Sequence, residues 1–281
     1  MNGTVDLHVH TTASDGTDSP AWVIALAHAL GLAAVAITDH DTVAALPEAM
    51  EAGPQLGVEV VPGIELSADY RGREVHILGY FIDYTDPDLQ EVLAQAVRSR
   101  VRRNEAILQA LDADSMHISP ADMPVAPGAV PGRPHIAQAL VHLGYADDLK
   151  DAFDRYIGLG KPYYRPRKLM GLGQAVSAIR QAGGVASLAH PMKYGFDRAG
   201  REALVQAARE VGCAALEAYY AEHTPSQQAE LVKLAAQYGL ALSGGSDYHG
   251  ARRPRTQLGT GIGGSLAVPC RILDGLKALR P

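Results

Sequence analysis

A regular alternation of short apolar runs with helical patterns is the feature that most limits how this 281-residue chain can fold. Segments typical of strands occupy residues 4–9, 32–38, 58–66, 73–82, 185–189, 214–220 and 240–244. Helical spacing follows or precedes most of them, at residues 20–30, 43–52, 172–182, 201–211 and 225–238. Such alternation predicts a parallel sheet covered by helices, and the short strands favour closure into a barrel.

One long stretch interrupts this alternation. It contains a strongly helical segment at 89–111, a Pro- and Gly-containing segment at 120–134, and two further helical patterns at 135–143 and 146–157. We therefore predict an α/β barrel built from residues 1–87 and 169–281, with residues 88–168 forming an inserted helical subdomain.

Composition excludes several classes of protein. Hydrophobic residues make up 47% and charged residues 20%, which is enough apolar material for a large core. The net charge of −6 argues against attachment to duplex DNA by bulk positive charge. The chain has neither a secretory leader pattern nor an apolar run long enough to span a membrane. The two cysteines match no metal or redox spacing, so we expect a reducing, cytoplasmic environment.

Residues able to bind metal ions gather at the predicted strand ends, where parallel barrels place their active sites. They are His8, His10, Asp15, Asp39, His40, Asp41, Glu65, His76, His190, Asp247 and His249. Imidazoles and carboxylates without thiolates favour Zn, Mn or Fe. Because one ion cannot use so many donors, we expect two or three divalent ions, with Glu65 as the shared ligand. Paired ions can support displacement at phosphorus, so the pattern predicts phosphate ester hydrolysis.

These segments, taken in order, resemble a known family. The strings Asp6-Leu7-His8-Val9-His10, Ser14-Asp15-Gly16, Thr38-Asp39-His40-Asp41, Pro62-Gly63-Ile64-Glu65, Val75-His76-Ile77-Leu78-Gly79, Ala189-His190-Pro191 and Gly245-Ser246-Asp247-Tyr248-His249 are similar to the polymerase and histidinol phosphatase (PHP) family. The resemblance implies a distorted seven-stranded β/α barrel with a trinuclear metal centre.

The resemblance also implies three sets of ligands. The first is His8, His10, Glu65 and Asp247; the second is Glu65, His76 and His190; the third is Asp15, His40 and His249. Asp15 stands where some family members have a histidine. Asp39 and Asp41 flank a ligand, and we expect them to orient their neighbours without binding metal.

Two segments of the insertion, residues 132–137 and 158–163, resemble the PHP branch that hydrolyses nucleoside 3′,5′-bisphosphates and short RNAs, in which the insertion caps the barrel. The resemblance implies that Arg133 and Lys161 bind phosphate. Arg100 and Arg103 also match that branch, although their spacing is equally that of a solvated basic helix. His135 and His223 are further candidates for substrate contact, with a purely structural role as the alternative.

The expected reaction is attack on phosphorus by a metal-bridging hydroxide, with His190 or Asp247 assisting proton transfer and Glu65 holding the ions. The substrate implied by the resemblance is a small phosphorylated molecule: a nucleoside 3′,5′-bisphosphate losing its 3′-phosphate, or a short oligoribonucleotide trimmed from 5′ to 3′. Histidinol phosphate or another small phosphomonoester is the alternative. A non-catalytic module and a metal-storage protein are the other classes, but no polymerase sequence is attached here.

Overall fold

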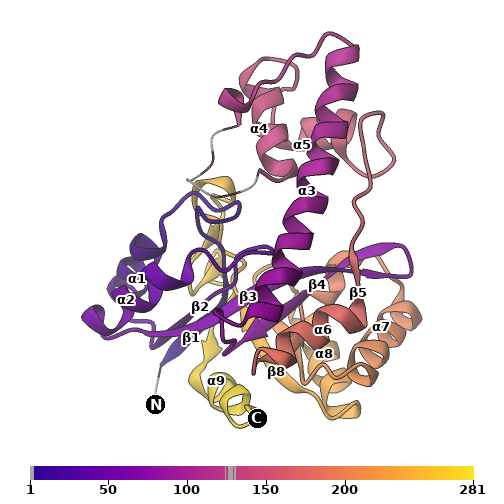
Figure 1. Ribbon diagram of the computed structural model, residues 1–281. Coiled ribbons are helices and arrows are strands. Elements are labelled where there is room, and N and C mark those ends of the chain that lie inside the picture. Colours follow the sequence, from indigo (N-terminus) through magenta and orange to yellow (C-terminus); the bar gives the residue numbers. More distant parts are fainter. Residues whose placement is uncertain (1–2, 124, 126–128, 130) are drawn as a thin grey trace. The chain divides into compact units, whose positions relative to one another are not determined.

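The computed structural model describes residues 3–123, 125, 129 and 131–281 (Figure 1). The chain separates into two compact units, Met1–Leu93 with Leu169–Pro281, and Ala94–Lys168. Part of the Pro- and Gly-containing segment predicted at 120–134, namely residues 124, 126–128 and 130, lies outside the described residues.

Seven strands of the first unit form a nearly closed barrel. They are β1 (Thr4–Val9), β2 (Ala34–Ile37), β3 (Glu59–Tyr70), β4 (Arg73–Tyr80), β6 (Val185–Leu188), β7 (Ala215–Tyr220) and β8 (Ala241–Gly245), paired in that order. The end of β8 returns to β1, because the Asp247 N–H donates to the His8 carbonyl over 2.9 Å. Gly245 permits this approach, since a Cβ there would lie 2.3 Å from the His8 nitrogen. The predicted α/β barrel is confirmed.

The barrel departs from an all-parallel sheet at β4, which runs antiparallel to both β3 and β6. The expectation of a parallel sheet is wrong for this strand. Tyr70 and Arg73 are paired across a two-residue turn, Arg71-Gly72, in which both residues have positive φ. Such a turn joins antiparallel neighbours only, whereas a parallel partner requires a long crossover.

Two short strands join the barrel sheet, and two others form a small sheet of their own. One strand, β11 (Val268–Pro269), pairs antiparallel with the start of β1. Another, β5 (Met170–Gly171), pairs with β3, while β9 (Thr256–Gln257) and β10 (Gly261–Ile262) pair with each other. The amino-terminal half of β1 therefore lies beside β11, and only its carboxyl end meets the chain that follows β8, which explains the distorted closure.

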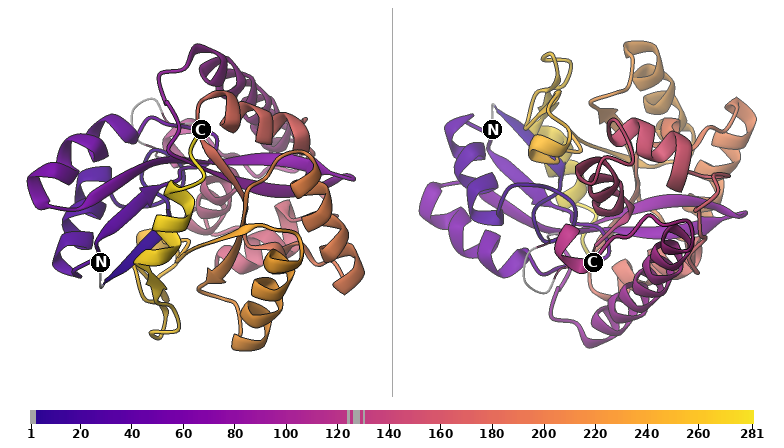
Figure 2. Two further views of the ribbon diagram at one scale, coloured as in Figure 1. Left: turned by 90° about the horizontal axis from the view of Figure 1, so that it is seen from below. Right: turned by 90° about the horizontal axis from the view of Figure 1, so that it is seen from above.

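Helices of the first unit pack against the strands (Figure 2). They are α1 (Pro20–Ala29), α2 (Leu46–Leu56), α6 (Leu172–Gln181), α7 (Arg198–Glu210), α8 (Pro225–Gln237) and α9 (Cys270–Lys277), with short turns η3 (Pro191–Tyr194) and η4 (Gly250–Arg252). Local sequence explains their starts: the Ser19 and Thr224 hydroxyls accept from backbone N–H groups of α1 and α8, each of which begins with proline. Among the described residues, no helix is long and apolar enough to cross a membrane.

The second unit is helical. The helix α3 (Pro87–Ala113) continues into it from the first unit, and α4 (Arg133–His142), α5 (Leu149–Ala152), a π-helical turn η2 (Phe153–Ile157) and a short turn η1 (Pro120–Asp122) follow. Its own core includes Ile107, Leu111, Ile136 and Leu140. The helix predicted from residue 146 begins only at Leu149, after the Asp148 side chain caps it.

Candidate metal centre

Glu65 lies at the centre of the histidines. This carboxylate is buried in β3, and its oxygens contact five imidazole rings from four different segments. The nitrogen–oxygen distances are 2.9 Å to His40 Nδ1, 2.9 Å to His76 Nδ1, 3.0 Å to His190 Nε2, 3.3 Å to His10 Nε2 and 3.4 Å to His8 Nε2. A ligand shared between ions needs this kind of central position.

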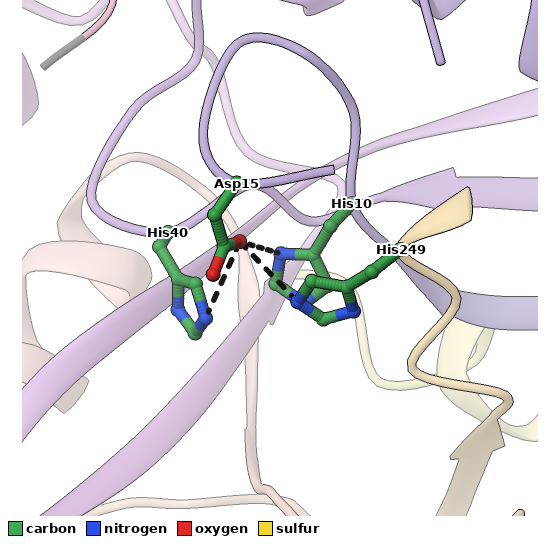
Figure 3. Close-up of side chains that lie close together, drawn as sticks. All are labelled: His10, Asp15, His40 and His249. Atoms are coloured by element: carbon green, nitrogen blue, oxygen red, sulfur yellow. Dashed lines mark ion pairs between the residues drawn. The ribbon is translucent and has the colours of Figure 1, made fainter. Parts of the chain in front are cut away.

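A second group forms around Asp15, which the loop after β1 supplies (Figure 3). Its Oδ1 lies 3.2 Å from His249 Nε2 and 3.9 Å from both His10 Nδ1 and His40 Nε2. Gly16 lets this loop turn back sharply, because a Cβ there would lie 2.6 Å from the His10 carbonyl oxygen. Three separate segments of chain thus bring imidazoles to one carboxylate.

Asp39 holds this loop in place from the end of β2. Its carboxylate accepts the Thr11 backbone N–H over 2.8 Å and the Thr11 hydroxyl over 2.7 Å, and it also accepts the Ser14 hydroxyl. Asp41, two residues later, accepts the Ser67 backbone N–H over 2.9 Å. Both aspartates therefore support the segments that carry Asp15 and Glu65.

Asp247 faces two ways. Its Oδ1 points toward the histidines, 3.3 Å from His10 Nε2 and 3.6 Å from His8 Nε2. Its Oδ2 accepts the Tyr220 hydroxyl over 2.7 Å and also accepts from Arg253. One oxygen is held by ordinary donors while the other is directed into the cluster.

Among the described residues, four groups of donors lie close enough for an ion. They are His10, Asp15, His40 and His249; His8, His10 and Glu65; His8, His190 and Asp247; and His40, Glu65 and His76. In each group the ligand atoms lie within 4.8 Å of one another. These groups overlap the three sets implied by the resemblance, but His10 joins the Asp15 group and His40 lies within reach of two groups.

Several buried donor atoms in this cluster have no hydrogen-bond partner in the described part of the chain. They are His8 Nε2, both ring nitrogens of His10, Glu65 Oε2, His190 Nδ1 and His249 Nε2. Leaving a buried polar atom unsatisfied costs about 1–3 kcal/mol. Divalent cations would satisfy these atoms, and a set of imidazoles and carboxylates is chemically suited to Zn, Mn or Fe, so the residues fit a metal centre.

The protonation states of two histidines and two carboxylates also suit cations, whereas nearby carboxylates raise the pKa of His8, His10 and His76. Burial lowers the pKa of His190 to about 3 and that of His249 to about 4, which leaves both rings neutral at pH 7 with a lone pair to offer. Burial opposes ionisation of Glu65 and Asp247, yet positive neighbours outweigh it and hold the pKa of both carboxyls well below the usual range. For Glu65 the strongest such neighbour is His76, and for Asp247 it is Arg253.

Three of the six non-glycine residues with positive φ in the described part of the chain lie in these loops. Asp41, His190 and Asp247 have φ values of 53°, 21° and 57°, in the region that glycine normally occupies. Such conformations cost of the order of 1–3 kcal/mol each and persist only where the surroundings impose them. Each of these residues is itself a candidate ligand or stands beside one.

Two candidate ligands lie elsewhere on their strands than expected. Glu65 is in the middle of β3, which continues to Tyr70, and His76 is the fourth residue of β4 rather than its last. The reversed direction of β4 explains this, because its starting half lies at the edge where the parallel strands end. The expectation that all of these residues gather at strand ends is therefore wrong for these two, although both contact the other donors.

Within the second unit, basic and aromatic residues gather near the start of α4. The Arg133 guanidinium lies 5.7 Å from the centre of the Tyr164 ring, and Tyr164 N–H donates to the Lys161 carbonyl. His135 Nδ1 accepts the Gly132 N–H over 3.0 Å, which closes the first turn of the helix. The Arg100 side chain also lies beside Gly132. Arg103, on the same helix as Arg100, donates from Nε to Asn104.

Sequence reasoning missed other side chains in contact with the cluster. Glu217 accepts from His8 and from the His190 backbone, while Arg253, Tyr220 and Lys193 surround Asp247. A carboxylate inside the apolar run of β7 was an available signal for Glu217, whereas nothing local marked Arg253. The predicted substrate residue His223 packs beside Tyr220, with its Nδ1 bonded to the Ala218 carbonyl.

Comparison with known proteins identifies the family. The model for the PHP domain matches residues 6–159. The 5′-3′ exoribonuclease Rnm of Escherichia coli K12 is 36% identical over 247 residues, covering 87% of this chain and 84% of that protein. The 3′,5′-nucleoside bisphosphate phosphatase of Chromobacterium violaceum is 32% identical over 251 residues, covering 87% of both chains.

A solved structure described as a metal-dependent phosphoesterase, from Bifidobacterium adolescentis, superposes with a TM-score of 0.86 at 30% identity, over 98% of this chain and 95% of that one. Family model, relatives and fold agree with the donor set assembled above. The chain therefore belongs to the PHP domain family and is a metal-dependent phosphoesterase.

Proposed function

We propose that this phosphoesterase hydrolyses nucleotide phosphate esters, removing the 3′-phosphate of nucleoside 3′,5′-bisphosphates and trimming short RNAs from the 5′ end. The observation that carries the proposal is the Glu65-centred cluster in a chain whose relatives include both a bisphosphate phosphatase and an exoribonuclease. The shared chemistry of those two substrates is a phosphate ester on ribose.

We assign the metal ligands as His8, His10, Glu65 and Asp247; Glu65, His76 and His190; and Asp15, His40 and His249. Two or three Mn, Zn or Fe ions are proposed. When bound there, such ions supply Lewis-acid stabilisation of the phosphoryl oxygens and activation of water. The buried donor atoms without hydrogen-bond partners support this assignment.

The residues of the chain would hold the centre in place, orient one another and move the proton. Glu65 holds the centre together because it contacts five imidazoles, and Asp39 and Asp41 fix the loops that carry its neighbours. Asp247 and His190 are the candidates for moving a proton to the leaving oxygen, because both lie in the cluster. Tyr220 and Arg253 orient Asp247 by bonding its outer oxygen.

We further propose that Arg133 and Lys161 bind the substrate phosphate, with Arg100, Arg103, His135 and His223 as additional contacts. Arginine offers a planar fork of donors that matches phosphate oxygens, and lysine adds a point charge. The position of Arg133 over the Tyr164 ring supports a role in binding an anionic group, since contact with the ring helps to hold the guanidinium in place.

A ranking of substrates tests the proposal. Purified protein loaded with Mn²⁺ is assayed for kcat/KM on adenosine 3′,5′-bisphosphate, a short 5′-phosphorylated RNA and histidinol phosphate. The bisphosphate and the RNA should be preferred by at least tenfold. Preference for histidinol phosphate would overturn the nucleotide assignment and support the small-phosphomonoester alternative.

A further inference from the structure

Glu217 is a carboxylate that the proposed reaction leaves without a role. It lies in the middle of β7, is fully buried, and follows Ala215 and Leu216 in an otherwise apolar run. Its Oε1 lies 2.9 Å from His8 Nδ1, and its Oε2 accepts the backbone N–H of His190 over 2.7 Å. One side chain thus holds two candidate ligands that come from different strands.

Hydrogen-bond chemistry makes the first of these contacts selective. When Glu217 is ionised it can only accept, and the His8 ring then carries a proton on Nδ1. The lone pair is then on Nε2, which faces Glu65 Oε1 at 3.4 Å and Asp247 Oδ1 at 3.6 Å. In the described part of the chain this nitrogen is buried without a hydrogen-bond partner.

The second contact acts on a strained segment. His190 has a φ of 21°, and its ring places Nε2 3.0 Å from the same Glu65 oxygen that faces His8. A non-glycine residue keeps such a conformation only when its surroundings hold it. The bond from the His190 N–H to Glu217 is a contact of this kind.

We propose that Glu217 is a positioning residue of the metal centre: it selects the His8 tautomer with Nε2 open and fixes His190, so that both rings face Glu65. Outer partners of this type raise metal affinity by about 10–100-fold in other proteins. The inference rests on the assignment of His8 and His190 as metal ligands in the proposed function.

The decisive variant is Glu217→Gln, which keeps the shape of the side chain but has one accepting and one donating end. It cannot accept from His8 and from the His190 N–H together. When its oxygen faces His190, its NH₂ group faces His8 Nδ1. This arrangement favours the tautomer with a proton on Nε2, and a protonated Nε2 has no lone pair with which to bind a metal. We expect Zn²⁺ affinity, measured by chelator competition, to fall 10–100-fold while the melting temperature of the metal-free protein changes little.

A direct readout is the tautomer itself. In ¹⁵N spectra of the metal-free protein, recorded at a pH at which the His8 ring carries one proton and assigned with a His8→Gln variant, that ring should show Nδ1–H in the wild type and Nε2–H in Glu217→Gln. Ser243→Ala is the matched control. Ser243 lies in β8 directly opposite Glu217 of β7, is equally buried, and bonds to Ser187. It should leave both metal affinity and tautomer unchanged.

The outcomes separate the two proposals. A wild-type protein that binds no metal would refute the metal centre itself, whatever the variant does. Wild-type Zn²⁺ affinity in Glu217→Gln, or a singly protonated His8 ring with its proton on Nε2 in the wild type, would overturn the role of Glu217 alone. The wild-type spectrum can still refute the role of Glu217 if the variant does not fold. Glu217→Asp, which keeps two accepting oxygens, should retain more affinity than Gln; an equal loss would indicate packing and contradict the proposal.

Discussion

The two units of the chain carry opposite charge. Residues 94–168 hold eleven Lys and Arg against eight Asp and Glu, a net charge of +3, while the remaining residues hold fourteen against twenty-three, a net charge of −9. A cluster that attracts divalent cations needs acids, and a surface that recognises phosphate needs bases. The overall charge of −6 conceals this difference, so composition alone could not show it.

The units also differ in how their polar groups are satisfied. In the barrel unit, buried nitrogens and oxygens of His8, His10, Glu65 and His249 lack hydrogen-bond partners in the described part of the chain. In the insertion, Arg133 lies over an aromatic ring and His135 caps a helix turn. Under the proposed function, the barrel unit binds metal and the insertion recognises phosphate. We therefore expect mutations to affect one of these properties without the other.

Removal of metal should have the largest effect, because it acts on the barrel unit's half of the comparison. Because the proposed reaction needs ions bound at the Glu65-centred cluster, dialysis against chelator should abolish turnover. Added Mn²⁺ should restore it. Metal at 100 times its dissociation constant should add about 2.7 kcal/mol to the free energy of unfolding, seen as a higher melting temperature. Full activity in protein shown by elemental analysis to be metal-free would contradict the metal centre.

Glu65→Ala should have the next largest effect. The variant loses the carboxylate that contacts five histidines, so we expect kcat/KM to fall by about 10³-fold or more, together with loss of bound metal. Kinetics and metal analysis on the same preparation check this. Wild-type activity with full metal content would refute the shared-ligand assignment.

Arg133→Ala should weaken phosphate recognition by the insertion. Loss of a charged hydrogen bond to phosphate should lower kcat/KM by about 10–100-fold, with metal content unchanged. Arg155→Ala is the control, since Arg155 lies in the same unit and pairs with Asp151 on the surface. If both variants behave like wild type, Arg133 has no part in phosphate recognition.

Asp39→Asn should have the smallest effect. The amide keeps one acceptor for the Thr11 bonds but weakens the hold on the loop that carries Asp15. We expect metal affinity to fall by about tenfold, with turnover recovering at saturating Mn²⁺. A loss of turnover that excess metal does not reverse would mean that Asp39 acts on the reaction itself.

The sequence was informative where chemistry follows from residue type and local spacing. His8 lies in β1 and His10 directly follows it, two residues on, while Asp15, His40 and His249 lie in the loops that follow apolar strands. Strand–helix alternation was enough to predict the barrel. The direction of β4 was the main error, although the Arg71-Gly72 turn already contained the signal for an antiparallel pair.

By itself, then, the sequence determined the class of fold and the kinds of donor atoms, because apolar periodicity and ligand chemistry are local properties of a chain. Only the tertiary structure decided which donors meet. Glu217 is 209 residues from His8, so that contact has no local signature. Arg253 is only six residues from Asp247, but no regular helix or strand spacing brings their side chains together. Such contacts depend on strand register and loop course, which arise from packing across the whole barrel.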